Sequence, residues 1–99
     1  MKKYLVLYKA GSSGSGQADQ PTTEEHKAWV VWKDDTANAI IDFGGPTIAV
    51  PGGGGGDIIG YSVVQADTLD ALDAVFETNP HRKQGGVIEY HEILEMPDA

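Results

Sequence analysis

The fold of this chain is decided by residues 58–76, IIGYSVVQADTLDALDAVF. The first nine of these residues are rich in Ile, Val and Tyr, which is typical of a strand. Asp67 or Thr68 can then cap a helix, which we expect Asn79-Pro80 to end. The apolar stripe of this helix would consist of Leu69, Leu72, Val75 and Phe76.

Three more strands and one more helix are predicted around this unit. Residues 3–8 form a first strand, residues 40–50 a second strand interrupted at Gly44-Gly45-Pro46, and residues 87–96 a last strand. A capping box, Thr22-x-x-Glu25, begins a helix that should end near Asn38. The apolar side of that helix comprises Ala28, Trp29, Val31 and Trp32, next to Asp35. Glycine-rich loops fill residues 10–20 and 51–56.

The element order β-α-β-β-α-β predicts an α+β fold of the ferredoxin-like type over residues 1–99, as a single domain. Both helices would cover one face of a four-stranded antiparallel sheet, which leaves the second face open. The strands nevertheless direct apolar side chains to both faces: Tyr4, Val6 and Tyr8 to one, Leu5 and Leu7 to the other. We therefore expect a homodimer that buries the open face, and the alternative is a monomer with an amphipathic sheet.

Composition excludes several classes of function. The formal net charge is −8 and only seven residues are Lys or Arg, so nucleic-acid binding is not expected. The chain has no cysteine, which excludes disulfides and thiolate chemistry and fits a reducing compartment. The apolar stretch after Lys2 and Lys3 is too short for a signal peptide or a membrane span. We expect a cytoplasmic protein with no membrane contact.

Several segments resemble the YCII-related (YciI-like) family. The most specific one is 60–71, GYSVVQADTLDA; others are Leu7-Tyr8-Lys9, residues 41–46, Pro80-His81 and residues 86–93. The resemblance implies a dimeric α-β barrel, in which two ferredoxin-like protomers face each other through their sheets. Most of the family has no known function. A few members resemble enzymes of chlorinated hydroxyquinone-type aromatics, and a His/Asp pair in a cleft has been proposed as the family's active site.

Asp42, His81 and His26 are the candidate catalytic residues. Asp42 lies in an apolar stretch, so partial desolvation would raise its pKa and suit a general acid or base. The alternative is an Asp that bonds backbone amides at a strand bend. His81, expected at the end of the second helix, and His26, in the first turn of the first helix, are alternatively solvated surface residues.

The candidate substrate-binding residues are Trp29, Trp32, Tyr61, Ser62 and Lys9. The two indoles can wall a pocket for a planar ligand or belong to the core. Tyr61 and Ser62 point to opposite faces, so at most one of them faces a given cavity. The chain shows no histidine spacing typical of a metal site, and the run of glycines at 52–56 lacks the features of a phosphate loop, so we predict no metal and no cofactor.

Two functions remain open on the sequence alone. The first is a small enzyme that acts on a small organic molecule, such as an aromatic one, by His/Asp acid-base chemistry. The second is a non-catalytic module that binds a small ligand or supports a partner protein. The sequence contains no strong catalytic motif that decides between them.

Overall fold

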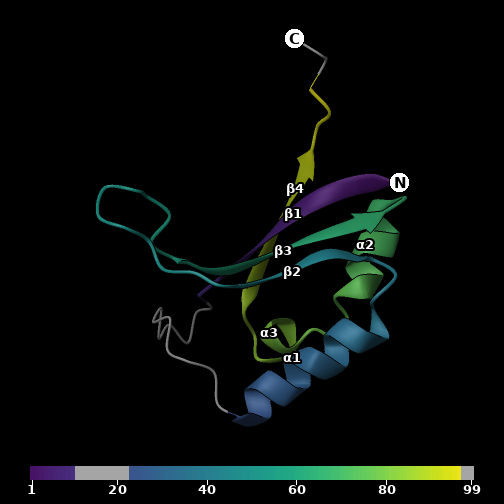
Figure 1. Cartoon of the computed structure of the whole chain (residues 1–99), viewed down its shortest axis with the longest axis horizontal. Helices are drawn as coiled ribbons and strands as arrows, with labels where there is room; N and C mark the ends of the chain where they lie inside the picture. Colours follow the sequence, from purple (N-terminus) through teal and green to yellow (C-terminus); the bar gives the residue numbers. More distant parts are fainter. Residues whose placement is uncertain (11–22, 97–99) are drawn as a thin grey trace.

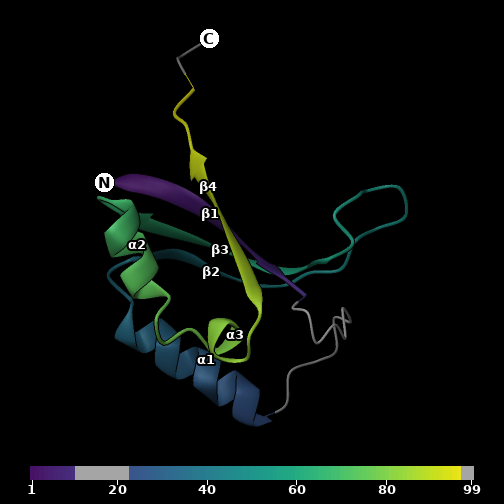
Figure 2. The same ribbon diagram turned by 180° about the vertical axis from the view of Figure 1, so that it is seen from behind.

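The computed structural model describes residues 1–10 and 23–96, so residues 11–20 of the predicted glycine-rich loop and the Thr22 cap lie outside the described residues. The elements are β1 (Lys2–Lys9), α1 (Thr23–Asp35), β2 (Ile40–Pro46), β3 (Ile58–Ala66), α2 (Leu69–Val75), α3 (Pro80–Lys83) and β4 (Val87–Ile93). The strands form one sheet of order β2-β3-β1-β4, in which every neighbouring pair is antiparallel. The helices lie on one side of this sheet (Figures 1 and 2). This arrangement confirms the predicted ferredoxin-like α+β fold.

The two faces of the sheet alternate along β1 as expected. Tyr4, Val6 and Tyr8 are buried, whereas Leu5 and Leu7 are only half-buried. Leu5 pairs with Val63 and Leu7 with Tyr61, and residues directly opposite each other share a face. We call the face that carries Leu5, Leu7, Tyr61 and Val63 the open face. The buried face packs against the helix layer.

Helix α1 packs through its two tryptophans. Trp32 is buried, its ring centroid lies 5.3 Å from that of Phe76, and its Nε1 donates to the carbonyl oxygen of Val75 at 2.9 Å. Trp29 packs edge-on against Trp32 at 5.7 Å. The predicted apolar stripe was wrong at Val31, which is 58% exposed, and at Ala28, which is also exposed. Large aromatic side chains reach the core while the smaller residues of the same helix remain outside it.

The second predicted helix is divided into two. Helix α2 begins after Thr68, whose hydroxyl accepts a hydrogen bond from Ala71 N, and it ends at Val75. Asn79 then caps α3, with Pro80 at its first turn. His81 therefore lies in the first turn of a short helix and not at the end of a longer one, because proline is favoured at a helix start.

Two strands are shorter than predicted. Strand β4 ends at Ile93, where its pairing with Lys3 of β1 ends. Strand β2 ends at Pro46, and its register with β3 shifts as the interruption at Gly44 predicted. Gly44 has φ +75°, and a Cβ at this position would collide with the carbonyl oxygen of Tyr61, so the bulge requires glycine.

Over the described residues, the structure contains no helix with the length and apolar character of a membrane span.

Candidate functional site

Tyr8 brings three of the predicted site residues together. Its ring lies edge-on to Trp29, with centroids 5.1 Å apart, and edge-on to His81 at 5.5 Å. Its hydroxyl lies 2.9 Å from Ser62 Oγ. We call Tyr8, Trp29, Ser62 and His81 the Tyr8 cluster. Sequence reasoning did not select Tyr8 as a site residue, although its position at the end of a strand, on the same face as Tyr4 and Val6, was an available signal.

The hydrogen bonds of the Tyr8 cluster have a defined direction. Ser62 Oγ donates its single proton to the carbonyl oxygen of Phe43 at 2.7 Å, so Tyr8 is the donor to Ser62. Burial raises the pKa of Tyr8 to about 12, although the bond to Ser62 opposes the rise. The phenol is therefore protonated at neutral pH. Its oxygen retains a lone pair that can accept a further hydrogen bond.

Asn79 lies beside this phenol. Its Oδ1 accepts from the backbone N–H groups of His81 and Arg82, at 3.0 and 3.2 Å, and so caps α3. Its side chain lies close enough to Tyr8 to oppose the rise of the Tyr8 pKa. Its Nδ2 is nevertheless buried with no hydrogen-bond partner among the described residues. Because buried donors are normally paired, the free lone pair of the Tyr8 oxygen is the natural acceptor for this amide.

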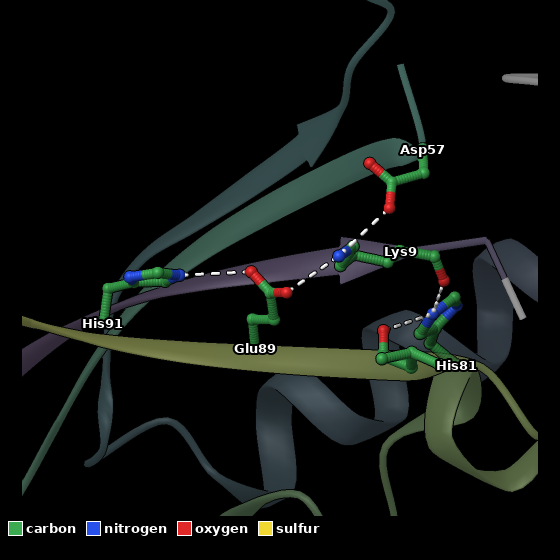
Figure 3. A network of polar contacts seen from close by, with 6 residues as sticks. Lys9, Asp57, His81, Glu89 and His91 are labelled. Atoms are coloured by element: carbon green, nitrogen blue, oxygen red, sulfur yellow. Dashed lines mark hydrogen bonds and ion pairs between the residues drawn. The ribbon is translucent and has the colours of Figure 1, made fainter. Parts of the chain in front are cut away.

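The imidazole of His81 is held by two backbone carbonyls. Nε2 lies 2.7 Å from the oxygen of Lys9 and 3.1 Å from that of Val87 (Figure 3). Because carbonyl oxygens only accept, Nε2 carries a proton, and in the neutral ring Nδ1 is the basic nitrogen. A Cβ at Gly86 would collide with the ring. Glycine at this position therefore makes the space in which His81 is held.

The ammonium of Lys9 is neutralised by two carboxylates. Its Nζ lies 2.8 Å from Glu89 Oε2 and 3.0 Å from Asp57 Oδ2, and both hydrogen bonds, Glu89 first, raise the pKa of Lys9 (Figure 3). Glu89 also contacts His91 Nε2 at 3.2 Å. The lysine that was expected to bind substrate thus already has two anionic partners.

Asp42 lies apart from the Tyr8 cluster. It is exposed, so the predicted partial burial was wrong. Its carboxylate accepts hydrogen bonds from Gly44 N at 2.9 Å and from the Tyr61 hydroxyl at 3.5 Å. The bond from Gly44 N agrees with the alternative prediction, an Asp that bonds backbone amides at a strand bend.

The sheet register separates Asp42 from His81. Asp42 pairs with Val63, whereas Lys9, which contacts His81, pairs with Ile58. These two β3 positions are five residues apart, or roughly 16 Å along the strand. Among the described residues, no hydrogen bond or ion pair joins Asp42 to a histidine. The structure therefore does not bring the candidate catalytic residues Asp42 and His81 together.

The remaining candidates divide between the surface and the core. His26 is exposed on α1, three residues before Trp29, so the two side chains lie on the same side of the helix. Trp32 belongs to the core, whereas Trp29 is partly exposed and can contact a ligand. Within residues 1–10 and 23–96, no group of three or more His, Asp or Glu side chains lies close enough together to hold a metal ion.

Comparison with known proteins identifies a similar fold. No family model matches the chain, and no curated protein matches it. Among solved structures, the chain is similar to 5-chloro-2-hydroxyhydroquinone dehydrochlorinase from Burkholderia phenoliruptrix AC1100, in its complex with 2,5-dihydroxybenzoquinone. The two share 22% sequence identity with a TM-score of 0.55, over 88% of this chain and 90% of that one. This similarity independently supports the α+β architecture.

Proposed function

We propose that this protein binds a small hydroxylated aromatic molecule at the Tyr8 cluster and removes a proton from it with His81. The observation that carries the proposal is the pair of carbonyls at His81 Nε2, which leaves Nδ1 as the basic nitrogen of the neutral ring. In the proton transfer, a ligand hydroxyl gives its proton to Nδ1. The products are an imidazolium and a bound phenolate.

The neighbours of His81 suit such a ligand. The partly exposed ring of Trp29 provides an aromatic surface for a planar molecule. The solved structure with the similar fold was obtained with a dihydroxybenzoquinone, and this supports the choice of ligand class.

A nitrophenol tests the proposal, since its ionised form absorbs visible light. At a pH where the free compound is mostly protonated, we expect the wild-type protein to produce the phenolate spectrum on binding. His81→Gln should bind without this spectral change, and His91→Gln, which alters an exposed histidine of β4, should behave as wild type. A phenolate signal that is unchanged in His81→Gln would contradict the proposal.

A non-catalytic binding module is the second candidate. It is favoured by Asp42, whose carboxylate is held by Gly44 and Tyr61 and has no histidine partner among the described residues. Binding of 2,5-dihydroxybenzoquinone or of the nitrophenol without any ionisation of the nitrophenol, in wild type and His81→Gln alike, would support this candidate over the acid-base enzyme.

We also propose that two copies associate through the open face, as in a dimeric α-β barrel. Leu5, Leu7, Tyr61 and Val63 form an apolar strip there, which none of the helices within residues 1–10 and 23–96 covers. A stable interface of this kind buries more than about 1,000 Å² in total. The absence of cysteine fits a reducing compartment, and the cytoplasm is the location we propose.

A further inference from the structure

The two acceptors of His81 Nε2 belong to neighbouring strands. Lys9 is the last residue of β1 that pairs with β4, and it pairs with Val87, the first residue of β4. The imidazole therefore reaches across the junction of two strand ends. Strand ends fray more readily than strand centres, and β4 is an edge strand whose Val87 is 48% exposed. The carbonyls of Lys9 and Val87 must therefore be kept at a fixed distance from each other if both are to accept from the Nε2–H group of His81.

The side chain of Lys9 supplies contacts that restrain this junction. Its ammonium is bound by Glu89 of β4 and by Asp57, which immediately precedes β3. The backbone N–H of Ala10 also donates to the carbonyl oxygen of Asp57 at 2.8 Å. One residue thus ties the end of β1 to both neighbouring strands, while its own carbonyl accepts from His81 (Figure 3).

We infer that Lys9 and Glu89 are positioning residues for His81. The ion pair holds the carbonyls of Lys9 and Val87 at the spacing that a proton on Nε2 requires, and so maintains Nδ1 as the basic nitrogen. This role rests on the proposed function of His81 as a base. It differs from substrate binding, because the Lys9 ammonium is already matched by two carboxylates and acts through its backbone.

The strength of this restraint follows from its exposure. The Lys9 side chain is 24% exposed and Glu89 39%, so solvent screens the pair in part. Exposed ion pairs contribute modestly, so the loss of this pair should change an opening equilibrium by up to about fivefold. The loss of the pair should therefore loosen the His81 ring without unfolding the domain.

NMR of the ligand-free protein tests the inference through the tautomer of His81 and the exchange rate of its Nε2 proton. In Glu89→Gln we expect this exchange to accelerate by up to about fivefold and the Nε2–H tautomer to lose population. Lys9→Met should have at least as large an effect. Glu92→Gln is the matched control, since Glu92 is also a β4 glutamate that pairs with a β1 lysine, Lys2, at 3.8 Å, but away from His81.

The outcomes separate this inference from the proposed function. An Nε2 proton that exchanges at the wild-type rate in Glu89→Gln would overturn the positioning role, whether or not ligands bind. Equal acceleration in Glu92→Gln would also overturn it, because the effect would then not be local. If the exchange responds as expected while nitrophenol shows no ionisation on binding, the positioning role is supported and the proposed function fails. Amide spectra confirm that each variant is folded, and Glu89→Gln alone suffices if Lys9→Met unfolds.

Discussion

Substitution of Tyr8 by Phe should change the pH dependence of stability in a predictable way. The change keeps the aromatic ring against Trp29 and His81 and removes only the hydroxyl that donates to Ser62. Near pH 8 the loss of this buried hydrogen bond should lower the free energy of unfolding by about 1 kcal/mol.

The effect at alkaline pH follows from the pKa of Tyr8. Burial raises this pKa from 10.0 to about 12, so the folded state holds its proton over a range in which the unfolded state releases it. The stabilisation by the buried phenol is therefore complete below pH 10 and is lost as the pH rises through 12. At about pH 11 the wild type should have lost about 1.4 kcal/mol through Tyr8 alone. Tyr8→Phe lacks this loss, so the stability difference should vanish or reverse.

Urea unfolding of wild type and Tyr8→Phe at about pH 8 and pH 11 measures this difference. The comparison cancels contributions from other groups that titrate in both proteins, such as Lys9 and Tyr90, whose pKa values are also raised. Tyr4→Phe, the buried tyrosine at the other end of the same strand face, is the matched control. A stability gap between wild type and Tyr8→Phe that stays constant from pH 8 to pH 11 would refute the reasoning.

Three further substitutions test other parts of the structure. Gly86→Ala places a methyl group in the position of the His81 ring, so the ring should move and stability should fall by about 1–3 kcal/mol; histidine NMR signals and urea unfolding check this. Trp32→Ala should cost about 3–5 kcal/mol because it empties a buried site and removes the bond to the Val75 carbonyl, and a loss below about 1 kcal/mol in urea unfolding would contradict the packing described. Val63→Lys should convert the proposed dimer to monomer or unfold it, whereas Gln65→Lys, near the end of the same strand face, should not; light scattering distinguishes the results.

The fold was largely predictable because strand and turn signals are local. The run of β-branched and aromatic residues at 58–66, the Thr68 cap and Gly44 each predicted the structure found nearby. The division of the second helix was missed because Asn79-Pro80 was interpreted only as an end. The same two residues also begin a helix, since Asn is a good N-cap and proline is tolerated in the first turn.

The candidate site was less predictable because it depends on contacts between distant residues. Tyr8 and Ser62 are 54 positions apart, and His81 meets the carbonyl of Lys9 across 72 positions. Every residue type has a backbone carbonyl, so the sequence could not predict that the carbonyl of Lys9 accepts from His81. Asp42 was misjudged for a related reason: it pairs with Val63, so it lies on the open face of the sheet and its carboxylate is exposed despite its apolar sequence neighbours.

The sheet order has a consequence for solubility. Strands β2 and β4 form the two edges of the sheet, and the unpaired backbone groups of an edge can recruit strands of other molecules into aggregates. Strand β4 carries Glu89 and Glu92, and repulsion between these like charges discourages stacking of a second β4 beside it. Strand β2 uses a different protection: its register is irregular and it ends in Pro46, which cannot donate a backbone hydrogen bond to an incoming strand. Replacement of both Glu89 and Glu92 by glutamine should therefore leave that edge as the more aggregation-prone of the two.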